Sequence, residues 1–278
     1  MILFAFLKRR PLISVCVPAY KSQDTIRETL LSALCQTVDD MEIVVSNDGG
    51  YPTPELESFA AHPKVRYFET ERRLGWVKNS NFALSNARGK FFMILPHDDV
   101  LRPQYVEECV NILERNRDVF AAYSDIEVDQ GVVLASEVAG SVEERIIEVM
   151  RNRYNGFSYR AVMPRHPKNW RNLQLKPNRP SDFCVDTTWI LQQACFGELR
   201  KVARPLYWKR INERNTHKAW TKLPQTDLIG AWQEHCRQMG DIAASRLDNT
   251  ELVSELVSHR LDARRVSETP AYLKAAMF

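Results

Sequence analysis

Two adjacent carboxylates, Asp98 and Asp99, follow the apolar run 91–95 and are the clearest candidates for chemistry in this chain. Each carboxylate resists leaving water, and their like charges repel each other. A divalent cation would relieve both effects, because Mg²⁺ and Mn²⁺ prefer hard oxygen ligands. Since such cations bridge phosphates, the pair indicates a nucleotide site. The alternative is a solvated turn or a helix N-cap ahead of Pro103.

Strands and helices are predicted to alternate along the first half of the chain. Alternating apolar residues predict a strand at 13–17, and short apolar segments predict further strands at 42–45, 65–68, 91–95 and 120–123. Apolar residues at helical spacing predict helices at 26–34, 79–87 and 103–115. Thr25 and Glu28 stand at capping-box spacing before the first of these helices. The alternation predicts an α/β fold with a mostly parallel, Rossmann-like sheet that is flanked by helices.

Polar side chains directly follow three of these strands. Tyr20 and Lys21 follow the first, Asn47 and Asp48 follow the second, and the acidic pair with its preceding histidine follows the fourth. Ligands of parallel sheets bind at the carboxyl ends of the strands, so we expect these loops to meet at one crevice. No G-x-G-x-x-G motif follows the first strand and no Walker A lysine loop is present, which argues against a dinucleotide site.

The second half of the chain has a different pattern. It predicts a hairpin around 129–131, a helix at 142–153, a helix that Ser181 caps and that ends at Phe196, a short strand at 199–202 and two helices after residue 224. The segment 154–180 has little periodicity. It is either a loop over the crevice or irregular surface.

Composition narrows the class of protein. A chain of 278 residues with 44% hydrophobic and 26% charged residues has a sizeable core, and a net charge of +3 is too small to argue for nucleic acid. The six cysteines are scattered without a C-x-x-C pair, which favours reduced thiols in a cytosolic protein. The apolar run 1–7 is too short to span a bilayer, and it precedes its charges. A frayed terminus or an edge strand explains it better than an interfacial anchor.

Several short motifs together resemble those of family 2 glycosyltransferases. Residues 13–21 (ISVCVPAYK) resemble V-S-V-I-I-P-x-Y-N, and residues 42–50 (EIVVSNDGG) resemble E-I-I-V-V-D-D-G-S. Residues 95–103 resemble L-x-x-D-D-x-x-x-P. The segments 74–90 and 197–210 resemble N-x-G…R-N…A-x-G-x and G-x-L…P-L-x-x-x-R. Each motif alone is weak, but their order and spacing over about residues 11 to 215 are specific.

The resemblance implies a GT-A fold and a transfer reaction. A sugar would move from a nucleotide-diphosphate donor, with UDP favoured, to an acceptor hydroxyl, with Mn²⁺ or Mg²⁺ as cofactor. The implied acceptor is a glycan or a lipid-linked glycan, made in the cytoplasm or at the inner face of the membrane. The basic segment 151–179 and the N-terminal run would suit peripheral membrane contact, although a solvated surface also explains both.

The resemblance also divides the chain. Residues 1–125 would form the nucleotide-sugar-binding half, 126–223 the acceptor-side half of the same GT-A domain, and 224–278 a C-terminal helical extension. The implied nucleotide-binding residues are Pro18, Tyr20, Asp48, Lys78 and His97. Among these, Tyr20 would stack on the base, Asp48 would accept a hydrogen bond from a ring N–H of uracil, and His97 would lie near the ribose.

The metal and the general base are also assigned by resemblance. Asp98 would hold the cation, Asp99 would be a second ligand or an orienting group, and His217 is a candidate third ligand. Asp186 would deprotonate the acceptor hydroxyl in an inverting reaction, with Asp182 in reserve one helical turn earlier. The plain alternative for Asp186 is an exposed charge on a helix.

The chain departs from the family pattern at several positions. Asn47 replaces the first aspartate of its pair, Pro96 occupies the place of an acidic ligand, and Val185 replaces the glutamate before Asp186. Ser80 replaces an arginine, and Lys78 or Arg73 would supply the lost charge to the diphosphate. The alternatives are a binding protein of the same fold that has lost catalysis and a nucleotidyltransferase, although the loop after the first strand lacks the basic, glycine-rich sequence of the latter.

Overall fold

The computed structural model describes residues 10–154, 157–165, 173–180, 182–211 and 216–277. The side chains of Thr216 and His217 lie outside this description, as do Ser181 and the predicted N-terminal apolar run. Within the described ranges, no helix is both long enough and apolar enough to cross a membrane.

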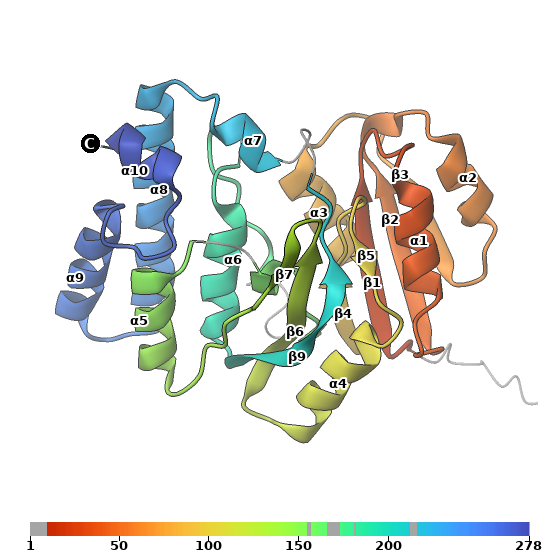
Figure 1. Cartoon of the computed structure of the whole chain (residues 1–278), viewed down its shortest axis with the longest axis horizontal. Coiled ribbons are helices and arrows are strands. Elements are labelled where there is room, and N and C mark those ends of the chain that lie inside the picture. The colour runs from red at the N-terminus through yellow and green to blue at the C-terminus, as the bar shows by residue number, and fades with distance from the viewer. Residues whose placement is uncertain (1–9, 155–156, 166–172, 181, 212–215, 278) are drawn as a thin grey trace, which may run out of the picture.

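A five-stranded sheet, in the order β3-β2-β1-β4-β8, forms the N-terminal part of the molecule (Figure 1). Its strands are β1 (Ile13–Ala19), β2 (Met41–Asn47), β3 (Val65–Glu69), β4 (Phe91–Ile94) and β8 (Met163–Pro164). The first four strands are parallel to one another, and β8 runs antiparallel to β4. This arrangement confirms the predicted, mostly parallel sheet.

A second sheet, in the order β5-β9-β6-β7, follows in the middle of the molecule. Its strands are β5 (Val100–Leu101), β6 (Val119–Val128), β7 (Gly131–Val133) and β9 (Glu198–Trp208). The predicted hairpin between β6 and β7 is confirmed. The strand predicted at 120–123 is continuous with the first arm of the hairpin in β6, and the strand predicted at 199–202 extends to Trp208 in β9, because the two strands pair in parallel along this length. Such cross-strand pairing overrides local propensity.

Helices cover the sheets and form the C-terminal part of the chain. They are α1 (Ile26–Leu34), α2 (Pro54–Ala60), α3 (Trp76–Ser85), α4 (Tyr105–Arg115), α5 (Val142–Asn152), α6 (Val185–Ala194), α7 (Thr216–Trp220), α8 (Gln225–Ala244), α9 (Thr250–Leu261) and α10 (Ala271–Met277). Short 3₁₀ helices, η1 (Asp48–Gly50) and η2 (Phe157–Arg160), complete the described elements. The short helices α2, α7 and α10 were not predicted, because a helix of one or two turns shows too little periodicity.

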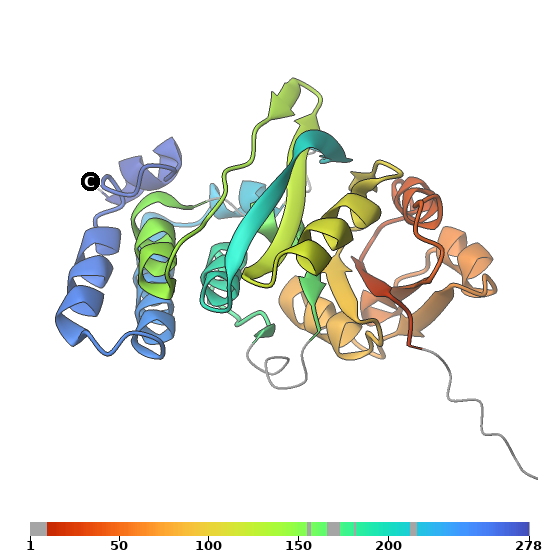
Figure 2. The same ribbon diagram turned by 90° about the horizontal axis from the view of Figure 1, so that it is seen from below.

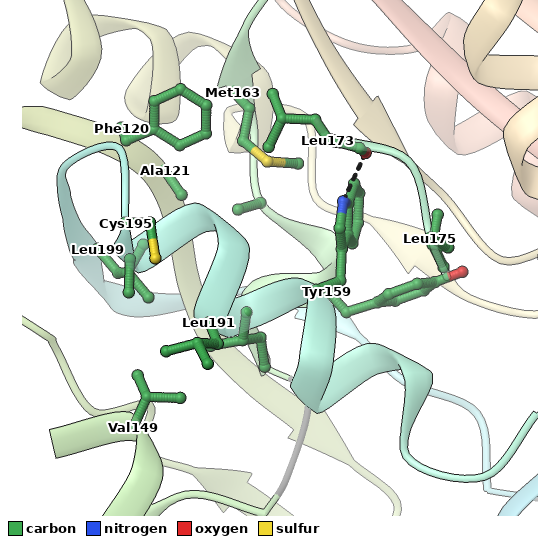
Figure 3. Close-up of a cluster of buried hydrophobic side chains, with 14 of the residues drawn as sticks. Phe120, Ala121, Val149, Tyr159, Met163, Leu173, Leu175, Leu191, Cys195 and Leu199 are labelled. Atoms are coloured by element: carbon green, nitrogen blue, oxygen red, sulfur yellow. Dashed lines mark hydrogen bonds between the residues drawn. The ribbon is translucent and has the colours of Figure 1, made fainter. Parts of the chain in front are cut away.

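The large sheet separates two hydrophobic clusters. Ile13, Val15 and Val17 of β1 pack with residues of α1 and α4, whereas Cys16 belongs to the cluster that contains α3 and α6. Figure 2 shows α1 and α4 on one side of the sheet and α3 on the other. In the second cluster, side chains of β6, β9, α5 and α6 converge, and the Trp189 indole donates to Leu173 O at 2.7 Å (Figure 3).

A buried arginine joins the C-terminal helices to this core. Arg260 of α9 is fully buried and donates to the carbonyl oxygens of Val149 (3.1 Å), Met150 (2.8 Å) and Arg153 (2.8 Å), at the C-terminal end of α5. Its Nε also donates to Nε2 of the buried His235, at 3.3 Å. The carbonyl groups at a helix C-terminus carry partial negative charge, so they stabilise the guanidinium where no carboxylate contacts it among the described residues.

Candidate active site

The acidic loop begins where β4 ends, at the carboxyl edge of the large sheet. Asp99 is buried and accepts three hydrogen bonds: from Tyr207 Oη (2.7 Å), from Arg160 Nε (3.0 Å) and from the backbone N–H of Arg210 (3.1 Å). Burial raises the pKa of Asp99, and the nearby Arg160 opposes that shift. Both carboxylate oxygens of Asp99 are therefore engaged by the protein itself.

The backbone of the same loop is fixed by the start of α1. The hydroxyl groups of Thr25 and Thr29 both donate to His97 O, each at 2.9 Å. Glu28 forms an ion pair with Arg210. The Nε of Arg210 also donates to the backbone oxygen of Asp98. The predicted capping box of Thr25 and Glu28 is therefore wrong, because both side chains bind the acidic loop and its neighbours instead of the helix.

Asp98 has a half-buried side chain between these fixed neighbours. No cluster of three or more histidine, cysteine or acidic side chains suited to a metal occurs within the described residues. Because Mg²⁺ is commonly held by one or two carboxylates together with substrate phosphates, Asp98 fits a site that the diphosphate of a ligand would complete. Asp99 fits the orienting role better, since its oxygens already accept three bonds.

The general-base candidate Asp186 lies in the first turn of α6 and shares an electrostatic environment with the acidic pair. Burial raises the pKa of Asp186. A hydrogen bond from the backbone N–H of Thr187 and the charges of Arg160 and Lys209 lower it. Arg160 also ion-pairs with Asp99, so one guanidinium faces both carboxylates.

Lys209 follows β9 and links the same groups. The neighbouring Arg160 and burial lower the pKa of Lys209, while the carboxylates of Asp99, Asp186 and Asp98 raise it. Three predicted acidic residues and two cations therefore act on one another at this edge of the sheet. The structure thus brings together Asp98, Asp99 and Asp186, which lie far apart in the sequence.

Asp182, the reserve base, has a different position from the one predicted. It was placed on the helix of Asp186, but α6 begins at Val185, and Asp182 has a positive φ of 53° before it. Burial raises the pKa of Asp182, while a backbone hydrogen bond from Asn178 and the charge of Lys78 lower it. The charges of Asp182 and of the predicted nucleotide-binding residue Lys78 therefore act on each other.

Asp48 organises the loop that precedes α3. Its buried carboxylate accepts hydrogen bonds from the backbone N–H groups of Leu74 (2.6 Å) and Gly75 (3.0 Å). Gly49 has a φ of 72°, and a Cβ there would lie 2.9 Å from the backbone nitrogen of Arg73. Only glycine permits this close approach, so the Asp48 turn and the loop of Arg73 are held against each other.

An aromatic and cationic surface lies at the carboxyl end of β1. The Arg73 guanidinium lies 4.3 Å from the centre of the Tyr20 ring, and the Tyr51 ring packs edge-on at 6.0 Å. Lys21 Nζ lies 5.6 Å and 5.5 Å from the two rings. Pro18 is half-buried in β1 nearby. Planar π systems of this kind accept a stacked base or a cation.

Three contributors to the site were missed or fall outside the description. Arg160 lies in the segment without periodicity, so its sequence context gives no signal. Lys209 has no distinctive sequence pattern of its own. Its position next to Arg210, a residue of the family motif, is the one signal that the sequence offers. His217, the candidate third metal ligand, has its backbone in α7, but its side chain lies outside the described residues.

Comparisons with known proteins agree with this geometry. A family model described as Glycosyl transferase family 2 matches residues 14–195. An uncharacterized glycosyltransferase of Rickettsia felis is 37% identical over 123 residues, which are 42% of this chain and 20% of that protein. This chain covers between 15% and 35% of the length of the Rickettsia relatives that it matches.

Two solved structures share the fold. S. aureus TarS residues 1–349, in complex with UDP-GlcNAc, superposes with a TM-score of 0.69 at 15% identity, covering 90% of this chain and 71% of that chain. The mannosyltransferase PcManGT of Pyrobaculum calidifontis, in complex with GDP-Man and Mn²⁺, gives a TM-score of 0.58 at 18% identity, covering 96% of this chain and 79% of that one. These likenesses confirm the predicted GT-A type of α/β fold.

Proposed function

The chain belongs to glycosyl transferase family 2, and we propose that it transfers a sugar from a nucleotide-diphosphate donor to an acceptor hydroxyl. One observation carries the proposal: Asp99 and Asp186 both act on Arg160 and Lys209, and Lys209 also interacts with Asp98, at the carboxyl edge of the sheet. Ligands of open α/β sheets bind at this edge. Carboxylates that can hold a cation and accept a proton are what the transfer of a sugar from a diphosphate needs.

The donor is proposed to bind over the surface formed by Tyr20, Tyr51 and Arg73. Stacking on a ring contributes about 1–3 kcal/mol per base in single-strand binders, and it does not depend on the identity of the base. Asp48 would add the preference for uracil by accepting a ring N–H, since a carboxylate has more acceptor sites than its two backbone partners use. The TarS complex with UDP-GlcNAc supports UDP as the nucleotide.

The diphosphate is proposed to lie between Asp98 and the cations around it. Asp98 would hold Mn²⁺ or Mg²⁺, and the PcManGT complex with Mn²⁺ supports such a cation. The cation would neutralise charge on the leaving nucleoside diphosphate. Asp99 would fix the loop through Arg160 and Tyr207, so that Asp98 is presented in one position. His97, whose carbonyl oxygen α1 holds, would lie beside the ribose.

Asp186 is proposed to take the proton of the acceptor hydroxyl in an inverting reaction. Burial increases its affinity for a proton, which brings the group closer to the operating pH of a general base. Arg160 and Lys209 oppose that effect, because their positive charges favour the ionised carboxylate. Asp182, with Lys78 beside it, remains the second candidate for this role.

The two halves of the fold would then have separate tasks. Tyr20, Asp48 and Asp98 come from residues 1–125 and would hold the donor, whereas Arg160 and Asp186 come from residues 126–223 and would face the acceptor. The helices in 224–278 would form an extension that packs on α5 and α6. We propose a glycan or a lipid-linked glycan as the acceptor, at the cytoplasmic face of a membrane.

A nucleotide panel tests this function. The melting temperature is measured with UDP, GDP and ADP, each with and without Mn²⁺, because a ligand that binds only the folded state raises stability. The account expects the largest upward shift with UDP and Mn²⁺. Hydrolysis of UDP-sugars by the same protein distinguishes an enzyme from a binding protein of the same fold. If no nucleoside diphosphate shifts the melting temperature, the proposed function is wrong.

A further inference from the structure

A cavity of about 570 Å³ lies at the opposite edge of the large sheet from the candidate active site. Its walls come from the amino ends of the strands: Pro11 precedes β1, Glu42 and Arg66 lie near the starts of β2 and β3, Arg88 precedes β4, and Arg165 follows the antiparallel β8. Its volume falls within the range of small-molecule sites. None of these residues takes part in the proposed transfer reaction.

Positive charge dominates the lining. Four arginines face one carboxylate among the described residues that line the cavity: Arg10, Arg66, Arg88 and Arg165 against Glu42. The Glu42 carboxylate is already engaged by Ser14 Oγ (2.6 Å), by the backbone N–H of Arg88 (2.7 Å) and by Arg66 Nη1 (3.2 Å). Among the described residues that line the cavity, four guanidinium groups therefore surround one carboxylate that already accepts three hydrogen bonds.

The arginines are held in place by backbone oxygens. Arg10 Nε donates to Arg88 O at 2.7 Å, and Arg66 Nη1 donates to Asn86 O at 2.6 Å. These bonds use one nitrogen of each guanidinium, and a guanidinium has five N–H donors. The remaining donors of Arg10 and Arg66 are therefore available to a ligand. Burial and the repulsion of Arg10 lower the pKa of Arg165, so a bound anion would relieve a repulsion that the fold maintains.

We propose that this cavity binds a phosphate-bearing anion, either a free diphosphate-type ligand or a phosphorylated lipid headgroup. Guanidinium groups bind phosphate oxygens in pairs of parallel hydrogen bonds, which favours phosphate over a single carboxylate. Ser85 and Asn86 add polar groups to the wall, and the apolar contribution comes from Pro11 and Ala87. Because most of the lining residues are polar or charged, the cavity suits a compact anion better than a stacked base.

Calorimetric titration with inorganic pyrophosphate, in the presence of EDTA, tests the proposal. The variant is Arg88→Gln with Arg165→Gln, because both substitutions keep the backbone N–H groups that donate to Glu42 and to Lys90 O. Arg264→Gln is the matched control, since Arg264 is an exposed arginine in the turn between α9 and α10. The expected result is a loss of about tenfold or more in pyrophosphate affinity in the double variant and no loss in the control.

Co-sedimentation with vesicles separates the two sources of phosphate. Vesicles of phosphatidylglycerol with phosphatidylcholine are compared with vesicles of phosphatidylcholine alone. Arginine-dependent binding to the anionic vesicles identifies a lipid headgroup, and binding of pyrophosphate without vesicle binding identifies a soluble ligand. If the double variant melts early, the single Arg88→Gln variant, whose side chain is exposed, carries the comparison. The proposal would be overturned if the protein bound neither pyrophosphate nor anionic vesicles. It would also be overturned if the arginine variants bound both probes as tightly as the wild type.

Discussion

Asp99 and Arg160 form a buried ion pair, with Arg160 Nε 3.0 Å from Asp99 Oδ2 and side-chain exposures of 13% and 2%. The pair joins the end of β4 to η2, two segments that lie 61 residues apart in the chain. Tyr207 of β9 donates to the same carboxylate oxygen. The acidic loop at the end of β4 is therefore held by two further segments, η2 and β9, directly beside Asp98.

Removal of the Arg160 guanidinium should expose the free-energy cost of burying the Asp99 carboxylate. We expect Arg160→Met to lower the free energy of unfolding by about 3–5 kcal/mol, because an unpaired buried carboxylate is left behind. Urea denaturation monitored by circular dichroism measures the change. Arg102→Met is the matched control: its ion pair with Glu127 is exposed and should contribute about 1 kcal/mol or less. Equal losses in the two variants would show that the Asp99–Arg160 pair has no special role.

The pH profile of activity should report Asp186 and its cationic neighbours. Since burial raises the pKa of Asp186, activity should fall on the acidic side at a pH above the ordinary range of an aspartate. Lys209 lowers that pKa, so Lys209→Met should move the acidic limb of kcat/KM to higher pH. Asp227→Asn, an exposed aspartate in the first turn of α8, is the control. An unchanged limb in Lys209→Met would argue against Asp186 as the titrating base.

The Asp48 carboxylate should couple loop order to nucleotide affinity. In the wild type, the backbone N–H groups of Leu74 and Gly75 each donate to a separate oxygen of Asp48. Asp48→Asn keeps only one side-chain oxygen, so one of these two hydrogen bonds is lost. We expect faster hydrogen exchange at residues 70–75 and about tenfold weaker UDP binding. Exchange followed by mass spectrometry and calorimetric titration measure the two effects. Weaker binding without faster exchange would mean that Asp48 acts on the base alone.

Stability should decline as pH falls below neutrality because of His235. Burial, together with Arg260, lowers the pKa of His235 well below its ordinary value, so the folded protein keeps the imidazole neutral. Below the unfolded pKa of about 6.5, the unfolded chain binds the proton that the folded chain refuses, and stability is lost. The urea midpoint should therefore fall when the pH is lowered from about 7.5 to about 5.5, values about one unit either side of the unfolded pKa. The fall should be larger in the wild type than in His235→Gln.

The same contact makes Arg260 the most sensitive position of the C-terminal helices. Arg260→Met removes the donors of three carbonyl groups and of His235. We expect a loss of about 3 kcal/mol or more in the free energy of unfolding, since buried acceptors are left unsatisfied. Arg264→Met, with an exposed side chain, should be nearly neutral. A neutral Arg260→Met would mean that the C-terminal helices do not depend on this contact.

Sequence patterns were sufficient where one segment carries the whole signal. The alternation in β1 predicted that strand, because β1 buries alternate residues on the two faces of the sheet. The polar residues after β1 and β2 indicated the carboxyl edge of the sheet, where the proposed donor site lies. The acidic pair and Asp186 were assigned by resemblance, and the structure places them in one electrostatic environment.

The remaining features depend on contacts between distant segments. Thr25 has the spacing of a cap, but the carbonyl oxygen of His97 lies within reach and receives its hydroxyl instead. Arg160 lies in a segment without periodicity, and only its contact with Asp99 reveals its role. Asp182 looked helical beside Asp186, yet the backbone at Asp182 and Cys184 has positive φ, so the helix begins after them.

The most direct test of the central claim is a titration with UDP, with and without Mn²⁺, on the wild type, Asp98→Asn and Asp186→Asn. The account predicts that Mn²⁺ strengthens UDP binding in the wild type and in Asp186→Asn, and that Asp98→Asn loses this gain. It also predicts that Asp186→Asn loses sugar transfer while it still binds UDP. A gain from Mn²⁺ that survives in Asp98→Asn, or full activity in Asp186→Asn, would contradict a shared site for the donor, the cation and the base.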